Sequence, residues 1–177
     1  GVFSKGSFDR GTEVLLNYLT VNPTFTSALD LGCGYGVVGI YLNKVYDLNV
    51  DMVDINKRAI ELSIENVGLN EVTANVFQSD GFKNVVKKYD LIVSNPPFFE
   101  NSFLSYHSQR NQARHTISFS YDELFKKVKN LLSKDGCFYF ILPADKYENI
   151  SWLININGLY INSLLEVYGK ESKLVRH

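Results

Sequence analysis

The segment Ser94-Asn95-Pro96-Pro97-Phe98 holds the residues whose types and spacing are best suited to chemistry. It follows an apolar run over 89–93 that predicts a buried strand. The two prolines fix φ and remove two backbone donors, and Asn95 is held extended because it precedes a proline. The Asn95 side-chain oxygen and the Pro96 carbonyl can each accept one N–H of a planar amine, and Phe98 can stack on the ring that carries it.

Hydrogen bonds of this kind would activate an exocyclic amine as a nucleophile. The lone pair of that amine is delocalised into its ring. Two acceptors placed off the ring plane favour a tetrahedral nitrogen with a localised lone pair, and so stabilise the transition state more than the ground state. A bare Asn-Pro-Pro segment is also a common turn at the end of a strand, and the motif alone does not decide between the two interpretations.

A second motif lies upstream, where a short apolar run breaks into alternating glycines, Asp30-Leu31-Gly32-Cys33-Gly34-Tyr35-Gly36. Glycines let the backbone turn tightly and approach a ligand, and a predicted helix behind them offers free N–H groups. Asp54 ends the next predicted strand, at about the spacing where an acid receives ribose hydroxyls in nucleotide-binding βαβ units. An acid at position 30 would repel a pyrophosphate and attract an ammonium. We therefore expect an adenosine with a cationic amino-acid tail, the alternative being a glycine-rich turn without a ligand.

The hydrophobic pattern alternates between helix and strand along the chain. Helices are expected at 11–19, 37–46, 57–68, 82–87, 121–132 (with Ser120 as N-cap) and 145–156. Strands are expected at 27–31, 49–53, 73–77, 89–94, 137–142 and 159–167. This alternation predicts an α/β protein with a mostly parallel sheet and helices on both faces. Ligands bind such sheets beyond the carboxyl ends of the strands, where Asp30, Asp54, Asp80 and Asn95 are all expected to lie.

Composition limits the class of protein. A chain of 177 residues with 45% hydrophobic and 21% charged residues predicts one soluble domain over 1–177, with a helical lead-in over 1–25. Cys33 and Cys137 lie far apart and the histidines are not spaced as ligands, which favours a reducing cytoplasm and no metal. No segment predicts a membrane span. The net charge of −1 argues mildly against a large footprint on RNA.

Local charge differs from the average in the segment 95–119, which follows the Asn-Pro-Pro turn. From Asn101 to Tyr121 there is no Asp, Glu or Lys, whereas Arg110, Arg114 and His115 are present. A polar, aromatic and cationic loop can hold phosphates and stack on exposed bases. We interpret the segment as a substrate loop, and the alternative is a surface loop without a role.

Together the motifs resemble the successive signatures of class I S-adenosylmethionine-dependent methyltransferases that act on an exocyclic amine. The chain is similar to the small-domain methyltransferases related to the small-subunit rRNA guanine-N2 enzymes from Gly1-Val2-Phe3-Ser4-Lys5 through Asp54-Ile55-Asn56-Lys57-Arg58-Ala59-Ile60-Glu61-Leu62. From Asn95 onward it is more similar to bacterial tRNA(Val) adenine-N6 methyltransferases, notably over 110–116 and at Gly169-Lys170-Glu171. The resemblance implies a Rossmann-like class I fold with a terminal antiparallel hairpin. Because the chain stops at His177, we expect terminal antiparallel strands to be truncated.

The resemblance also implies roles for single residues. S-adenosyl-L-methionine is expected to contact Asp30, Gly32, Gly34, Gly36, Asp54, Asp80 and Phe82. The catalytic turn is expected to comprise Asn95, Pro96, Pro97 and Phe98. The RNA is expected to contact Phe99, Arg110, Arg114 and His115. Asp80 could instead cap a helix. No general base is required, because the positive sulfonium drives methyl transfer and the methylated nitrogen can then release its proton to water.

We therefore expect an enzyme that methylates an exocyclic amine of an RNA base, with adenine N6 in tRNA placed before guanine N2 in small-subunit rRNA. Methylation of a protein glutamine amide also fits the Asn-Pro-Pro turn, but enzymes of that kind usually carry an extra helical domain before the first strand. A non-catalytic RNA-binding module is the remaining alternative, and such a relative would be expected to lose the acceptor pair at Asn95 and Pro96.

Overall fold

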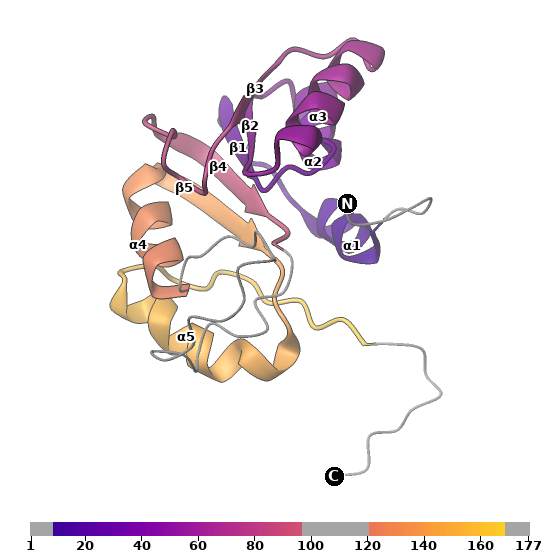
Figure 1. The fold of residues 1–177 in the computed structure, drawn as a ribbon. Coiled ribbons are helices and arrows are strands. Elements are labelled where there is room, and N and C mark those ends of the chain that lie inside the picture. Colours follow the sequence, from indigo (N-terminus) through magenta and orange to yellow (C-terminus); the bar gives the residue numbers. More distant parts are fainter. Residues whose placement is uncertain (1–8, 97–120, 169–177) are drawn as a thin grey trace, which may run out of the picture.

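The computed structural model describes residues 9–96 and 121–168, which form one parallel sheet flanked by helices (Figure 1). The strand order is β3-β2-β1-β4-β5, and every pairing between neighbours is parallel. The strands are β1 (Ser27–Leu31), β2 (Asn49–Asp54), β3 (Ala74–Gln78), β4 (Tyr89–Ser94) and β5 (Leu132–Phe140). This arrangement confirms the predicted Rossmann-like α/β fold.

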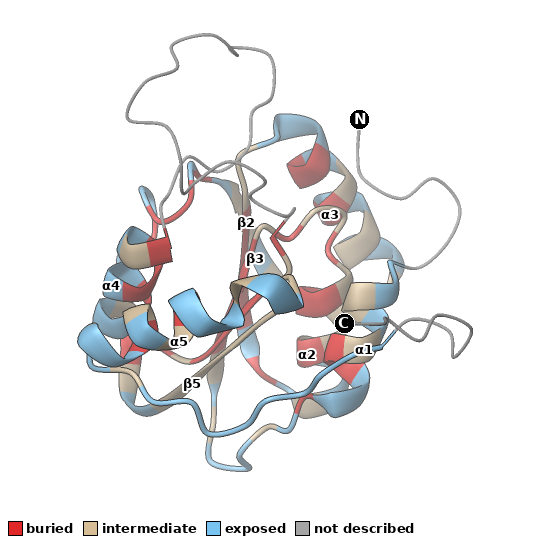
Figure 2. Ribbon diagram, turned by 90° about the horizontal axis from the view of Figure 1, so that it is seen from below, coloured by how far each residue is buried: buried red, intermediate tan, exposed pale blue. Residues whose placement is uncertain are grey.

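The helices cover both faces of the sheet, as predicted. They are α1 (Arg10–Tyr18), α2 (Val37–Tyr46), α3 (Lys57–Leu69), α4 (Tyr121–Leu131) and α5 (Tyr147–Ile156), and a short 3₁₀ helix η1 (Ala144–Lys146) precedes α5. Alternate strand residues face opposite sides. Ala28 and Met52 therefore belong to one buried cluster with side chains of α1, α2 and α3, whereas Leu29 and Ile92 belong to another with side chains of α4 and α5. Figure 2 shows the buried segments facing inward between these layers.

The expected helix over 82–87 is wrong, because residues 81–84 form a turn and residues 85–87 are irregular. Gly81 has φ +55°, which interrupts a helical path, and the backbone N–H groups of Lys83 and Val85 each bond three residues back, to Asp80 and Phe82. The Ser79 hydroxyl oxygen accepts the N–H of Asn84 at 3.1 Å. A compact polar turn therefore connects β3 to β4.

The strand expected over 137–142 begins earlier in the structure, because β5 starts at Leu132 and includes Asp135 and Gly136. The pairing of β4 with β5 is irregular there: Tyr89 pairs with Leu132, but Leu91 pairs with Cys137. A Cβ on Gly136 would lie 3.0 Å from the Tyr89 carbonyl oxygen. The glycine therefore allows close approach of two strands at a bulge.

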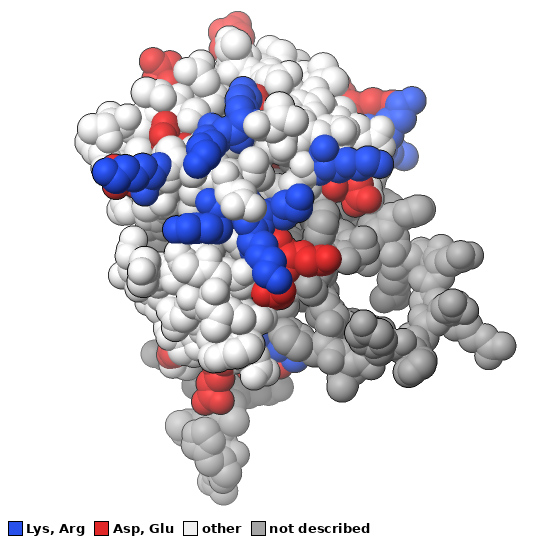
Figure 3. All heavy atoms as spheres, turned by 90° about the vertical axis from the view of Figure 1, so that its left-hand side faces the viewer, with Lys and Arg blue, Asp and Glu red and all other residues white. Residues whose placement is uncertain are grey.

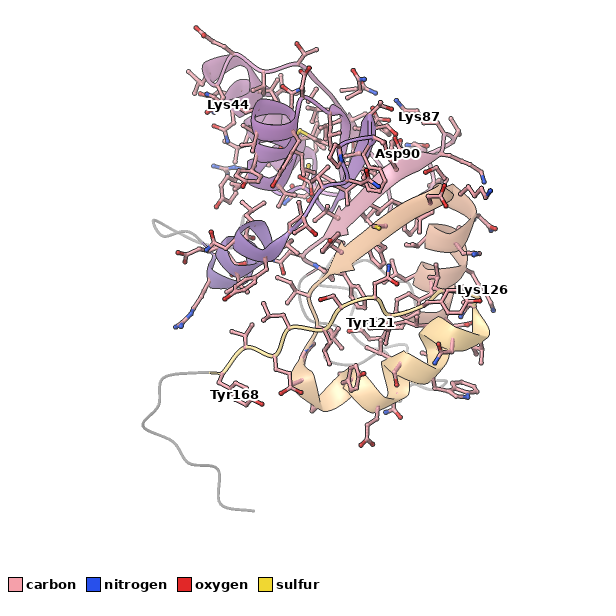
Figure 4. The ribbon with its side chains drawn as sticks, turned by 180° about the vertical axis from the view of Figure 1, so that it is seen from behind. Lys44, Lys87, Asp90, Tyr121, Lys126 and Tyr168 are labelled. Carbon is pink, nitrogen blue, oxygen red and sulfur yellow. The ribbon has the colours of Figure 1, made fainter. Side chains whose placement is uncertain are left out.

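The expected strand over 159–167 is absent from the structure. The segment runs irregularly after α5 to Tyr168 (Figure 4), and in the described part of the chain no strand pairs with it. Its apolar side chains are substantially exposed, Leu164 to 49% and Val167 to 58%. Residues of high β-propensity form a strand only when a neighbouring strand pairs with them, because hydrogen bonds between strands hold a strand in place. A terminal antiparallel hairpin is not present among the described residues.

Candidate active site

The order of the strands creates one place where neighbouring loops diverge, between β1 and β4. The chain crosses from β1 to β2 in one direction and later returns to β4 on the other side of β1. Leu31, the last residue of β1, pairs with Ser94, the last residue of β4, and the Ser94 hydroxyl donates to the Leu31 carbonyl at 2.9 Å. The glycine loop after β1 and the Asn95 turn after β4 therefore start side by side, at the usual ligand position of such sheets.

The glycine loop adopts conformations that other residues rarely adopt. Gly32, Gly34 and Gly36 have φ values of +77°, +56° and +94°. A Cβ on Gly36 would lie 2.6 Å from the Met52 side chain, so that glycine is required by packing. A Cβ on Gly34 would have no neighbour within 4 Å, so the backbone at this position faces open space that a ligand could fill.

Asp54 anchors the glycine loop to the end of β2. Its Oδ2 accepts the N–H of Gly34 at 2.9 Å, and its Oδ1 accepts the N–H of Asn56 at 2.8 Å. Asp54 is half-buried, and each carboxylate oxygen retains a lone pair for a further donor. Asp54 does not cap α3, because the N-cap of that helix is Asn56, whose side chain accepts the N–H of Arg58. Asp54 lies at a strand end, as predicted.

Asp30 lies beneath the same loop, where it is 2% exposed. Its Oδ2 accepts the N–H of Gly39 at 2.8 Å. This bond satisfies the first turn of α2, whose N-cap residue Gly36 has no side chain to do so. Burial is the main cause that raises the Asp30 pKa to about 7; the Gly39 hydrogen bond opposes the rise, and the Asp54 charge adds a smaller increase. A nearby ammonium would favour the ionised form.

The third predicted acid, Asp80, follows β3. The N–H of Ser79 donates to the Asp54 carbonyl at 3.0 Å, which brings the ends of β2 and β3 together. Asp80 is exposed at this edge. Because no helix follows, capping a helix does not explain Asp80. Phe82 is 4% exposed and belongs to the buried cluster that includes Leu31 and Val53, so it lies close under the same edge.

The Asn95 turn is anchored by residues that the sequence interpretation missed. The Asn95 Nδ2 atom donates to Asp9 Oδ2 at 2.7 Å and to Thr12 Oγ1 at 2.9 Å. Asp9 is the N-cap of α1 and accepts the N–H of Thr12. An acid three residues before a threonine at the start of an amphipathic helix signals a cap. Nothing local in the sequence signals its contact with Asn95.

Several predicted site residues lie outside the described residues: Pro97, Phe98, Phe99, Arg110, Arg114 and His115, with the rest of the substrate loop over 97–119. Ser120, the Gly169-Lys170-Glu171 ending and His177 lie outside them too. Of the predicted residues that are described, the structure brings Asp30, the three glycines, Asp54 and Asn95 to one edge of the sheet. Asp80 and Phe82 lie at the neighbouring strand end of that edge.

Within residues 9–96 and 121–168, a metal site and a membrane-spanning helix are both absent. No group of three His, Cys, Asp or Glu side chains there could hold a metal ion. Over the same residues, no helix combines the length and the apolar character needed to cross a membrane.

The chain is similar to known proteins of one family. A model of the family "Methyltransferase small domain" matches residues 1–150. The chain is 36% identical to a tRNA1(Val) (adenine(37)-N6)-methyltransferase of Bacteroides fragilis, over 90% of this chain and 70% of that protein. It is 37% identical to the ribosomal RNA small subunit methyltransferase C of Aliivibrio fischeri, over 83% of this chain but 39% of that protein.

Solved structures agree at the level of the fold. The 16S rRNA N2 G1207 methyltransferase of T. thermophilus, solved with AdoMet and guanosine, superposes with a TM-score of 0.67 over 88% of this chain and 40% of that one, at 24% identity. A methyltransferase from Pyrococcus furiosus superposes with a TM-score of 0.71 over 90% of this chain and 76% of that one, at 16% identity. With the family match, these findings establish that the chain belongs to the small-domain methyltransferase family.

Proposed function

We propose that this protein transfers a methyl group from S-adenosylmethionine to an exocyclic amine of an RNA base, and that this amine is adenine N6 of a tRNA. The observation that carries the proposal is the pairing of Leu31 with Ser94, which sets the glycine loop beside the Asn95 turn. Donor and acceptor sites must adjoin for a direct transfer. Three of the similar proteins named above are RNA methyltransferases by name, and two of these names specify an exocyclic base nitrogen. Such a substrate would place the enzyme in the cytoplasm.

The donor half of the site fits S-adenosylmethionine, which when bound supplies a methyl group on a positive sulfonium. The open side of Gly34 leaves room for its amino-acid tail. Asp54 keeps lone pairs for the ribose hydroxyls, because Gly34 and Asn56 use only part of its acceptor capacity. Asp30 contributes negative charge below the loop, and Asp80 is the proposed acceptor for the adenine amino group.

The acceptor half is the Asn95 turn. Asn95 Oδ1 and the Pro96 carbonyl accept the two amine hydrogens, and Phe98 stacks on the target base. Accepting from both hydrogens localises the lone pair and aims it at the methyl group. No general base takes part, because the methylated nitrogen loses its proton to water afterwards. The base must leave its stack to reach this turn, so an unpaired loop nucleotide is the favoured target.

The choice of adenine in tRNA over guanine in rRNA is supported by the extent of the similarity. The chain spans 70% of the tRNA enzyme from Bacteroides fragilis but 39% of the rRNA enzyme from Aliivibrio fischeri, at nearly equal identity. The substrate loop also resembles the tRNA enzymes over 110–116. Guanine N2 of small-subunit rRNA is the second candidate. Glutamine methylation and a purely RNA-binding role rank lower, since both relatives modify RNA.

The test is incubation of the protein with labelled S-adenosylmethionine and total bacterial RNA, followed by fractionation and nucleoside analysis. We expect label in N6-methyladenosine within the tRNA fraction, and none with the Asn95→Ala variant. Label in N2-methylguanosine of rRNA would support the second candidate instead. Absence of label from all RNA, with S-adenosylmethionine bound normally, would overturn the proposal.

A further inference from the structure

The side-chain amide of Asn95 is held by the start of α1, which is distant in the sequence. Two oxygens surround its nitrogen, Asp9 Oδ2 at 2.7 Å and Thr12 Oγ1 at 2.9 Å. Asn95 itself is half-buried. Within the described residues no hydrogen bond to Asn95 Oδ1 accompanies these two bonds. The amide is therefore anchored on its nitrogen side, and its oxygen is left for another donor.

The chemistry of these two partners fixes which way the amide faces. The Thr12 hydroxyl donates to Asp9 Oδ2 at 3.1 Å, so it presents only lone pairs to Asn95. An ionised carboxylate can only accept. Both groups therefore demand a donor, and only the nitrogen of the amide can satisfy them. Turning the amide over would set its oxygen against two oxygens.

Asp9 is kept in this acceptor form. Partial burial raises its pKa, but hydrogen bonds from the Thr12 N–H, Asn95, the Thr12 hydroxyl and the Gly11 N–H together lower it below the usual value. The carboxylate thus remains ionised at neutral pH. It also caps α1 through the Thr12 N–H at 2.9 Å, which ties the orientation of Asn95 to the start of a helix.

Gly11 provides the space for this arrangement. A Cβ at this position would lie 3.1 Å from Asp9 Oδ2, 3.2 Å from the Ile141 side chain and 3.5 Å from Asn95 Nδ2. Glycine is a poor helix former, yet it stands in the first turn of α1. The absence of a side chain lets the helix start approach the Asn95 turn closely enough for the bonds to form.

We infer that Asp9 and Thr12 are positioning residues that hold the Asn95 oxygen toward the acceptor amine. The inference rests on the proposed function and deepens it, by assigning part of the catalytic geometry to α1. A free amide would spend part of its time with its N–H groups toward the amine, where they would repel the amine hydrogens that only the amide oxygen can accept. Holding one orientation beforehand removes that loss from the reaction step.

The test uses matched substitutions. Thr12→Val removes the hydroxyl at nearly constant volume and helix propensity, whereas Thr12→Ser keeps it. Asp9→Ser retains a good N-cap but is too short to reach Asn95. We expect Thr12→Val and Asp9→Ser to lower the single-turnover methylation rate about 10- to 100-fold, with S-adenosylhomocysteine affinity and thermal midpoint nearly unchanged, and Thr12→Ser to restore the rate.

A second readout does not depend on activity. The Asn95 side-chain NH₂ signals in a ¹⁵N spectrum should exchange slowly with water in the wild type and in Thr12→Ser, and faster in Thr12→Val and Asp9→Ser. Equal exchange and equal rates in all four proteins would overturn the inference. A methylation rate that falls only in proportion to a loss of stability would also overturn the inference. An inactive wild type with the expected exchange pattern would count against the proposed function alone.

Discussion

Three carboxylates at the ends of adjoining strands differ in burial, and this difference separates their roles. Asp30 is buried, Asp54 is half-buried and Asp80 is exposed. A buried acid supplies charge, a half-buried one with spare lone pairs can accept hydroxyl donors, and an exposed one can reach the outer part of a ligand. Their order along the edge suits a cofactor that runs from a charged tail through a ribose to a base.

Cofactor affinity should depend on Asp54 and not on Asn95. Asp54→Ala removes a charged acceptor and also releases Gly34, so calorimetry with S-adenosylhomocysteine should show binding weaker by about 1–3 kcal/mol. Asn95→Ala should bind as the wild type does, because its side chain faces α1 and the acceptor side. Equal weakening in both variants would contradict the division of the site.

Asp30 should couple both stability and cofactor binding to pH. Its folded pKa of about 7 lies above the usual 3.8, so the folded state holds the proton more tightly and stability falls as pH rises from about 4 to 7. Asp30→Asn should remove this trend and unfold at higher denaturant concentration than the wild type at pH 8. The Asp30→Asn variant should also bind S-adenosylhomocysteine more weakly at pH 8, because the ammonium group of this ligand loses a nearby negative charge. A variant less stable than the wild type at pH 8 would contradict the assignment.

At the scale of elements, polar side chains join neighbouring strands at the edge opposite the site. Asp90 is the second residue of β4 (Figure 4), and its Oδ2 accepts the N–H of Thr26 at 3.0 Å and the hydroxyl of Ser27 at 3.0 Å. Its Oδ1 accepts the hydroxyl of Ser133 in β5 at 2.8 Å. One carboxylate thus ties β4 to β5 and to the start of β1, and fixes the register that aligns Leu31 with Ser94.

Asp90→Asn should therefore destabilise the fold in a pH-dependent way. The Thr26 N–H above all, with Ser133 and Ser27, outweighs burial and lowers the Asp90 pKa to about 2. A depressed pKa contributes stability above about pH 4 that is lost as pH falls through about 2. Discounted for solvent screening, the loss at pH 7 should be about 1–2 kcal/mol in urea unfolding. A loss that stayed constant down to pH 2 would point to packing instead of charge.

Most helices and strands could be predicted from the sequence, because the spacing of their apolar residues reflects which of their sides are buried. The helix expected over 82–87 fails because of the local backbone at Gly81. The other two errors share one cause, which is geometry that depends on a neighbouring strand. Gly136 reads as a turn residue, but it sits in β5 because two backbones approach closely there. The apolar residues of 159–167 read as a strand, but in the described chain they have no partner strand.

The residues of the candidate site also fall into those that the sequence could predict and those that it could not. Asp30, the glycines and Asp54 could be predicted, because adjacent residues of one βαβ unit create their pattern. The contact of Asp9 and Thr12 with Asn95 could not, because it joins α1 to the end of β4 across the sheet.

At the scale of the whole molecule, charges of both signs lie on the face opposite the site. Figure 3 looks toward the amino ends of the strands and shows lysine and arginine side chains mixed with acids on that face. With a net charge of −1, long-range attraction to RNA should be small. Affinity must then come from local contacts on the side of the Asn95 turn.

Arg110 and Arg114 are the proposed source of these contacts. Each arginine that neutralises a phosphate releases counterions, so Arg110→Ala/Arg114→Ala should flatten the salt dependence of RNA affinity by about one to two units of slope. S-adenosylhomocysteine binding should not change in the same double variant. Identical slopes in a salt titration of both proteins would show that RNA recognition lies elsewhere.

We propose that the Asn95 oxygen acts in the transition state of methyl transfer. The decisive measurement is the single-turnover methylation rate of Asn95→Ala on tRNA, with RNA and S-adenosylhomocysteine affinities measured on the same protein. We expect a rate lower by about 10²–10³ with both affinities near those of the wild type, because one placed hydrogen bond is lost only in the transition state. An unchanged rate, or a rate that falls only because binding is lost, would contradict it.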